Sequence, residues 1–250
     1  MARGRRRQLA HHVTTPDPRP TRDKDAALVQ AMFDRVAPRY DVANTIFSLG
    51  QDRHWRRVAA AAAAAGPGDT VVDVAGGTGA LAHELADAGA RVLALDFSWN
   101  MVATGAARAR AAGDDRVWWC NGDGMRLPLP DASVDAVAIA FGLRNLPDPA
   151  AGLAEFARVT RPGGRVVVLE FSHPTWAPFR SVYTRYLVGA VPALARVVTS
   201  DPAAYRYLAQ SIQAWPDQAS LARIISGAGW SQVRWKNLTG GIVAAHQAVR

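Results

Sequence analysis

The alternation of β-rich and helix-like runs after residue 69 is the feature that most constrains the fold of this chain. The β-rich runs cover residues 70–74, 91–95, 117–120, 134–140 and 165–171. Helix-like stretches separate them around residues 83–88, 101–112 and 150–160. Strands that alternate with helices build right-handed βαβ units, and such units form a parallel sheet with helices on both faces. The pattern therefore predicts an α/β fold with a mostly parallel sheet.

Two further β-rich runs close the chain, over residues 232–238 and 242–249. Only Thr239, Gly240 and Gly241 separate them. That is enough for a hairpin and too short for a crossover between parallel strands. We expect these runs to add an antiparallel pair, which brings the sheet to seven strands.

The chain before the first strand divides into a basic tail and two helices. Residues 1–22 hold six arginines and one aspartate, so they carry +5 of the net charge of +8, and they show no apolar periodicity. This composition predicts a disordered tail. Helical spacing of apolar residues predicts a helix between Asp25 and Pro38, and a second helix from Asp52 through the alanine block to Ala65.

Composition bounds the class of protein. Hydrophobic residues make up 49% of the chain, which suits one globular domain over residues 23–250. A single cysteine, Cys120, excludes an internal disulfide and a multi-cysteine metal site, and the histidines show no metal-ligand spacing. We therefore expect no metal and a cytoplasmic location. Beyond the tail the charge is nearly balanced, so no nucleic-acid partner is expected.

Candidate site residues lie just after the predicted strands, because open α/β sheets bind ligands beyond the carboxyl ends of their strands. The first such loop runs from Asp73 to Gly79, and its Gly77 and Gly79 let the backbone approach a ligand closely. The helix that follows offers free N–H groups to an anion. This glycine pattern alone also fits a dinucleotide site.

Two aspartates narrow the choice of ligand. Asp96 follows the second strand, 17 residues beyond Gly79, and can accept two hydrogen bonds from a ribose diol. NAD and S-adenosylmethionine share that ribose. Asp73 distinguishes them, because a carboxylate at the start of the loop repels a pyrophosphate and suits the ammonium of a methionine moiety. S-adenosylmethionine is therefore the favoured ligand.

The next two loops add candidates for binding the adenine and for the reaction. After the third strand, Asp123 can accept a hydrogen bond from an adenine amino group, and Gly124 leaves room for the ring. After the fourth strand, Arg144 and Asn145 stand where the reactive centre is expected.

With these loops assembled, the chain resembles the ubiquinone/menaquinone biosynthesis C-methyltransferase family, within the class I S-adenosylmethionine-dependent methyltransferases. The resemblance extends from about Asp25 to His246, and residues 170–180 and 214–218 look most like the demethylmenaquinone branch of high-G+C bacteria. The matching motifs include Ala75-Gly76-Gly77-Thr78-Gly79, Phe141-Gly142-Leu143-Arg144-Asn145, Arg161-Pro162-Gly163-Gly164-Arg165, Glu170-Phe171-Ser172 and Tyr207-Leu208-Ala209-Gln210-Ser211-Ile212.

The resemblance implies a Rossmann-like class I fold and methylation of a ring carbon of demethylmenaquinol, with S-adenosylmethionine as cofactor. It carries the family's cofactor positions onto Thr78, Asp96, Asp123 and Gly124. The chain departs from the family at Ala140, where a serine commonly contributes to the cofactor site. We expect the missing hydroxyl to weaken cofactor binding by about 1 kcal/mol.

The implied reaction needs an activated ring carbon. Loss of the phenol proton, whose pKa is about 10 in water, pushes electron density onto the adjacent carbon. Arg144 can stabilise the phenolate and Asn145 can orient its oxygen or a water molecule. Tyr40, in the region expected to cover the site, can complete the hydrogen-bond chain. Arg144, Asn145 and Tyr40 are therefore the catalytic candidates.

Residues 173–215 are expected to form a lid over the substrate. Within this segment, residues 176–198 interleave aromatic side chains with Arg180, Arg185 and Arg196, and two prolines prevent one long helix. Such a stretch suits a lid over an apolar substrate and peripheral contact with the inner face of the cell membrane. Ordinary core packing is the alternative.

Three other functions stay open at this point. The chain could methylate another quinol or a small lipophilic natural product. It could be a cofactor-binding regulatory or RNA-associated protein that uses the basic tail, or an NAD-dependent oxidoreductase. The oligomeric state, including a homo-oligomer, is also open.

Overall fold

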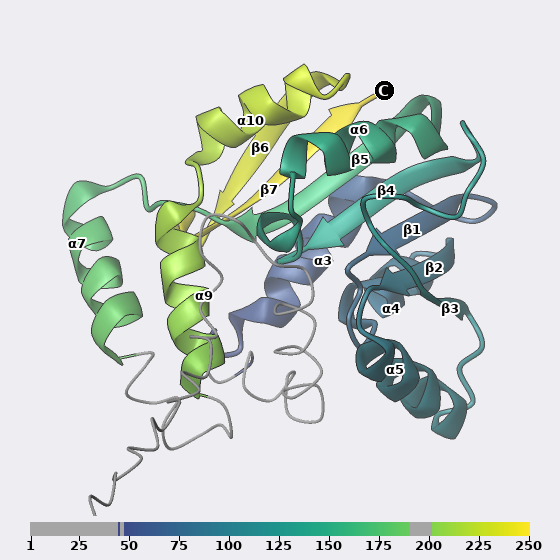
Figure 1. Ribbon diagram of the computed structural model, residues 1–250, viewed down its shortest axis with the longest axis horizontal. Coiled ribbons are helices and arrows are strands. Elements are labelled where there is room, and N and C mark those ends of the chain that lie inside the picture. Colours follow the sequence, from purple (N-terminus) through teal and green to yellow (C-terminus); the bar gives the residue numbers. More distant parts are fainter. Residues whose placement is uncertain (1–44, 46–47, 191–201) are drawn as a thin grey trace, which may run out of the picture.

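One mixed sheet organises the computed structural model, which describes residues 45, 48–190 and 202–250 (Figure 1). Within these residues seven strands lie in the order β3-β2-β1-β4-β5-β7-β6. The strands are β1 (Thr70–Val74), β2 (Arg91–Asp96), β3 (Val117–Asn121), β4 (Val134–Ala140), β5 (Thr160–Phe171), β6 (Ser231–Leu238) and β7 (Val243–Val249). All pairs from β3 to β5 are parallel, and β7 is antiparallel to both β5 and β6. The predicted α/β fold is confirmed, including its antiparallel C-terminal pair.

The strand boundaries agree with the sequence pattern to within one residue, except at the start of β5. The pattern placed that start at residue 165, whereas β5 begins at Thr160, which pairs with Val134 before the register shifts. Residues 161–164 form an irregular extension of the strand, which a β-rich pattern does not mark because it contains Pro162, Gly163 and Gly164.

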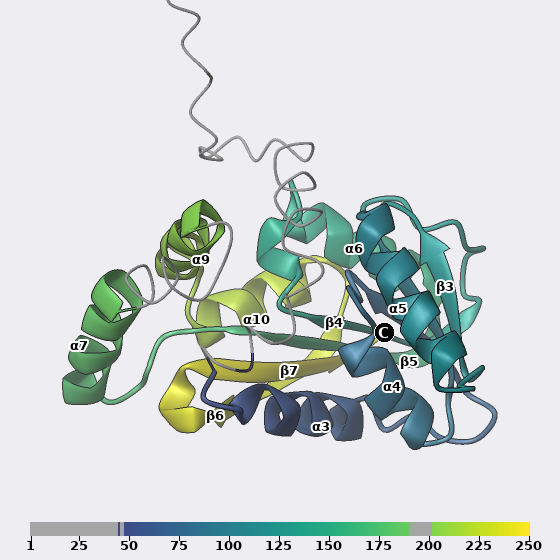
Figure 2. The ribbon, with the colours of Figure 1, turned by 90° about the horizontal axis from the view of Figure 1, so that it is seen from below.

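Helices cover both faces of the sheet, as Figure 2 shows. On one face lie α3 (Gln51–Ala63), α4 (Ala80–Asp87) and α5 (Trp99–Ala111), and on the other lie α6 (Pro149–Val159) and α10 (Gln218–Gly227). The predicted helix from Asp52 is thus α3. The predicted helix after Asp25 and the tail of residues 1–22 lie outside the described residues.

Successive residues of a strand pack on opposite faces of the sheet, where the two halves of the hydrophobic core lie. Val71 packs with the alanines of α3 and the leucines of α4, while its neighbour Val72 packs with Phe156 of α6 and Ile225 of α10. Each fully buried leucine, valine or phenylalanine side chain contributes about 1.5–3 kcal/mol. The alanines let α3 approach the sheet closely, so this helix lies along the sheet with Trp55, near its N-terminus, against Phe141 at the carboxyl end of β4.

A separate group of helices lies beyond the carboxyl ends of the parallel strands, on the left of Figure 1. It consists of α7 (Ala177–Arg185), the π-helical turn η3 (Tyr186–Ala190) and α9 (Pro202–Ala214). Of the helices in the described part of the chain, none combines the length and apolarity needed to cross a bilayer.

Candidate active site

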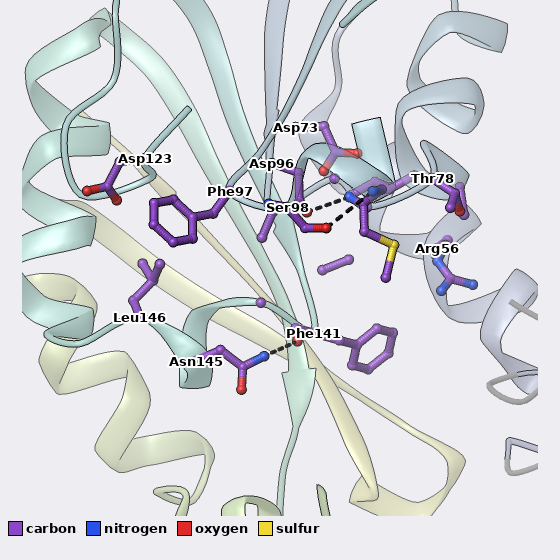
Figure 3. Close-up of a pocket in the computed structure, with 18 of the residues that line it drawn as sticks. Arg56, Asp73, Thr78, Asp96, Phe97, Ser98, Asp123, Phe141, Asn145 and Leu146 are labelled. Carbon is purple, nitrogen blue, oxygen red and sulfur yellow. Dashed lines mark hydrogen bonds between the residues drawn. The ribbon is translucent and has the colours of Figure 1, made fainter. Parts of the chain in front are cut away.

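A pocket opens at the carboxyl ends of β1, β2 and β4, where the strand order reverses direction. The empty space in it is about 1080 Å³ when the open solvent at its mouth is included. Figure 3 shows Asp123 and Phe97 at one end, Thr78 and Arg56 at the other, and Asp96 between them. This pocket therefore lies at the switch point of the sheet, which is where a ligand was expected to bind.

The loop after β1 forms the floor of this pocket. Ala75 and Gly77 both have positive φ angles, of 53° and 58°, so the chain turns sharply as it leaves the strand. Gly77 and Thr78 line the pocket, as predicted. Gly79 does not: a Cβ on it would collide with the ring of Trp119, so this glycine is needed for packing beneath the loop.

Asp96 joins the β1 loop to the start of α5. Its two carboxylate oxygens accept hydrogen bonds from the backbone N–H groups of Gly77 and Ser98, each at 2.8 Å (Figure 3). A carboxylate has about four acceptor positions, so both oxygens retain capacity for a ligand. The backbone bonds therefore hold Asp96 in place at the pocket wall.

Asp73 lines the same pocket but has no such support. It is 1% exposed, and neither carboxylate oxygen has a hydrogen-bond partner among the described residues. Burial raises its pKa to about 7 and Asp96 adds to the shift, while Arg56 and the nearby backbone N–H of Ala82, which lies outside hydrogen-bond geometry, oppose it. A buried carboxylate without a partner is costly, so this end of the pocket suits a ligand that brings a cationic donor.

Arg56 is a pocket residue that the sequence analysis missed. It projects from α3, forms a 2.5 Å ion pair with Asp52 one turn earlier, and lies 5.9 Å from the ring centre of Phe141. The four-residue spacing of Asp52 and Arg56 is the signal in the sequence, because it places both side chains on one helix face.

The loops after β1 and β4 pack directly against each other. A Cβ on Gly142 would come within 2.5 Å of the Ala75 Cβ, so only glycine fits there. Phe141 adopts a φ of 57°, which is unusual for a bulky residue. This turn places Phe141 and Asn145 in the pocket wall, with the amide Nδ2 of Asn145 donating to the Phe141 carbonyl at 3.5 Å.

Arg144, which was expected to face the reactive centre, is not among the residues that line this pocket. Its Nη1 lies 2.8 Å from Glu170 Oε1 and donates to the Phe141 carbonyl at 2.5 Å. Glu170 also accepts from the Phe171 N–H at 2.8 Å. Burial raises the pKa of Glu170 and Arg144 lowers it, so the carboxylate requires this partner. The pair ties the β4 loop to the end of β5.

The remaining predicted residues divide between the pocket and its surroundings. Asp123 lies exposed at the rim, where its Oδ1 accepts from the Met125 N–H at 2.8 Å. Gly124 is not in the lining, and its missing side chain instead leaves space for Val74. Ala140 lines the pocket. Tyr40 lies outside the described residues.

The fold is similar to that of solved methyltransferases. The structure aligns with a SAM-dependent methyltransferase from Aquifex aeolicus at a TM-score of 0.54 and 20% identity, over 73% of this chain and 82% of that one. A chain from the complex between the Haloferax volcanii Trm112 methyltransferase activator and the putative methyltransferase aligns at a TM-score of 0.60 and 21% identity, over 87% of this chain and 96% of that one. At these identities the likeness concerns the fold alone.

The chain belongs to the ubiE/COQ5 methyltransferase family, whose model matches residues 21–250. It is 57% identical to a Mycobacterium sp. (strain KMS) protein named demethylmenaquinone methyltransferase, over 93% of this chain and 98% of that protein. A Renibacterium salmoninarum protein of the same name is 52% identical, over 91% and 94%. The resemblance inferred from the sequence motifs is confirmed.

Proposed function

We propose that this protein transfers a methyl group from S-adenosylmethionine to a ring carbon of demethylmenaquinol and so produces menaquinol. The observation that carries the proposal is the identity of 52–57%, over more than nine-tenths of the chain, to relatives named demethylmenaquinone methyltransferase. The chemistry of the pocket agrees with the cofactor, and its apolar wall agrees with the acceptor.

The order of residues along the pocket suits the order of groups in S-adenosylmethionine. Asp123 and Phe97 stand where the adenine would lie, and Asp96 stands where it can accept hydrogen bonds from the ribose hydroxyls (Figure 3). At the other end, the buried Asp73 carboxylate suits the ammonium group, and the Arg56 cation and Thr78 hydroxyl suit the carboxylate. A dinucleotide fits less well, because the same carboxylates would face its pyrophosphate.

When bound, S-adenosylmethionine supplies an electrophilic methyl group on its sulfonium. The protein must then orient the acceptor and favour its phenolate, since a neutral phenol is a weak carbon nucleophile. Asn145 is the polar side chain of the β4 loop that lines the pocket, so it can donate to the acceptor oxygen. Arg144 ties that loop to Glu170, so its proposed role is to position the loop that carries Asn145.

The helices over residues 173–215 act in this proposal as the lid on the acceptor side. Leu146, Pro147 and Phe141 give the pocket wall next to them an apolar surface. α9 is joined to the β4 loop by hydrogen bonds from Arg144 to Ser211 and from Tyr207 to Asn145. These bonds connect the lid to the residues that would contact the acceptor. Tyr40 keeps its proposed place in the hydrogen-bond chain.

The same segment also supports a proposal of peripheral contact with the inner face of the membrane, which holds the quinol. Trp176 and Val182 are 67% and 63% exposed, and residues 173–190 contain exposed Arg180 and Arg185 but no acidic residue. Phe179 instead contacts Gly240, and Leu187 is buried. The contact would therefore be made by Trp176, Val182 and the two arginines.

Methyl transfer to a defined acceptor tests the function. The protein is incubated with S-adenosylmethionine labelled in its methyl group and with a prenylated demethylnaphthoquinone, either reduced or oxidised. We expect label on the ring carbon with the reduced form and none with the oxidised form, because only the quinol can ionise to a phenolate. Transfer to a benzoquinol or another lipophilic phenol, without transfer to the naphthoquinol, would replace this substrate assignment.

A further inference from the structure

The hydroxyl group of Tyr207, on α9, donates a 3.1 Å hydrogen bond to the side-chain oxygen of Asn145. Asn145 lines the pocket, whereas Tyr207 does not. The bond joins residues that are 62 positions apart in the chain. It therefore connects α9 to a side chain that lines the pocket.

Two neighbours together fix which way the Asn145 amide points. The Phe141 carbonyl, 3.5 Å from Nδ2, can only accept a hydrogen bond. If the amide were reversed, its oxygen would face that carbonyl oxygen, and two acceptors would repel each other. With Nδ2 toward Phe141, Oδ1 faces Tyr207, whose hydroxyl donates to it.

Tyr207 is suited to remain a donor. Burial raises the pKa of its hydroxyl, Arg144 opposes the shift and Glu170 adds to it. The phenol therefore stays protonated at neutral pH. Nδ2 carries two hydrogens and only one of them faces the Phe141 carbonyl, so the second N–H of Asn145 can be donated to a ligand in the pocket.

We propose that Tyr207 is a positioning residue, which holds Asn145 so that its amide donates to an oxygen of the methyl acceptor. This inference rests on the proposed function and deepens it, because it defines the acceptor as a molecule with an oxygen acceptor beside the methylated carbon. A phenolate satisfies that requirement, and an ammonium group does not. Tyr207 itself does not touch the acceptor.

A double-mutant cycle tests the proposal. Tyr207→Phe removes only the hydroxyl, while Asn145→Asp keeps the acceptor for Tyr207 and removes the N–H donor. We expect Tyr207→Phe to lower kcat about 10-fold and Asn145→Asp to lower it further, with the Kd for S-adenosylmethionine within about 2-fold of the wild type. Because Tyr207 acts through Asn145, the double variant should be no slower than Asn145→Asp.

Tyr183→Phe is the matched control. Tyr183 is a buried tyrosine on α7. Because it belongs to the proposed lid, this control is compared through the side-chain amide signals of Asn145 and not through turnover. Unchanged turnover in Tyr207→Phe, or additive losses in the double variant, would overturn the positioning role.

A measurement without substrate separates this inference from the proposed function. In ¹⁵N-labelled protein, the side-chain amide signals of Asn145 should shift in Tyr207→Phe and stay in place in Tyr183→Phe. If the wild type methylates no naphthoquinol but these signals shift, the substrate assignment fails and the contact stands. If the signals do not shift, Tyr207 does not position Asn145.

Discussion

Arg144 and Glu170 form a buried ion pair, with 2.8 Å between Nη1 and Oε1 and side chains that are 5% and 1% exposed. The pair joins the loop that carries Phe141 and Asn145 to the end of β5. Removing one partner of a buried pair leaves the other charge without compensation, which typically costs about 3–5 kcal/mol. Stability is thus the first property that this pair controls.

We predict that Arg144→Met lowers the free energy of unfolding by about 3 kcal/mol at pH 8. Without the arginine, the raised pKa of Glu170 rises further, so the carboxyl is protonated more readily in the folded state. The loss should therefore shrink as the pH falls, and urea unfolding at several pH values measures it. Arg144→Met/Glu170→Leu should recover part of the stability.

Turnover of the folded variant decides between the two roles of Arg144. If Arg144 only positions the loop, turnover should fall together with stability. If Arg144→Met/Glu170→Leu recovers stability but its turnover stays at least 100-fold below that of the wild type, about 2.7 kcal/mol, Arg144 stabilises the acceptor directly.

Asp73 should make the unliganded protein less stable as the pH rises. Its folded-state pKa, about 7, lies above the unfolded value of 3.8, so its favourable contribution is complete below about pH 4 and is lost as the pH rises through 7. Asp73→Asn removes this dependence. At pH 8 the unliganded variant should be more stable than the wild type, by at most about 4 kcal/mol.

Cofactor binding should show the opposite dependence on Asp73. The ionised carboxylate is the form that pairs with an ammonium group, so the affinity for S-adenosylmethionine should rise between pH 6 and pH 7 in the wild type and stay flat over that range in Asp73→Asn, below the pH at which the ammonium of the ligand loses its proton. Thermal unfolding with and without S-adenosylmethionine, over this range, measures both effects. If Asp73→Asn binds S-adenosylmethionine as tightly as the wild type at pH 7, Asp73 does not contact the ammonium group.

Asp96→Ala should weaken S-adenosylmethionine binding by about 1.5–3 kcal/mol, because the carboxylate that would bond the ribose is removed. The backbone N–H groups of Gly77 and Ser98 also lose their acceptor. Asp96→Asn serves as the control, since it keeps an acceptor oxygen and lacks the charge. Its affinity for S-adenosylmethionine should lie between those of the wild type and Asp96→Ala. Titration calorimetry measures the affinities, and equal affinity in folded Asp96→Ala would place the ribose elsewhere.

Local sequence patterns predict most of the sheet, because each strand is a contiguous β-rich run whose ends are marked by turn residues. The predicted runs 70–74 and 134–140 coincide with β1 and β4. The glycine loop and Asp96 could be placed at the pocket for the same reason. Their position follows from the end of a strand, and parallel strands end on one side of the sheet.

The contact between Arg144 and Glu170 could not be predicted in this way. Its partner Glu170 is 26 residues away, and the two meet because β4 and β5 pair with Ala140 opposite Leu169. The sequence of residues 141–145 alone does not predict that Arg144 meets the Glu170 carboxylate. Arg56 was missed because helical periodicity gives the face of α3 that is buried, but not that this face reaches the pocket.

The exposed apolar side chains of α7 and the residue before it should contribute to membrane binding. We predict that Trp176→Ser/Val182→Ser reduces binding to vesicles that contain phosphatidylglycerol by at least about 10-fold, since each exposed apolar side chain contributes about 1.5 kcal/mol or more when it leaves water. Trp118→Ser is the matched control, because Trp118 is 54% exposed on β3, at the opposite end of the molecule from α7 in both ribbon views (Figures 1 and 2). Arg180 and Arg185 should add a salt-dependent part that disappears with zwitterionic lipid. Vesicle flotation compares the wild type and both variants on each of the two lipid compositions. Equal flotation of the double variant and the Trp118 variant would mean that this face does not contact the membrane.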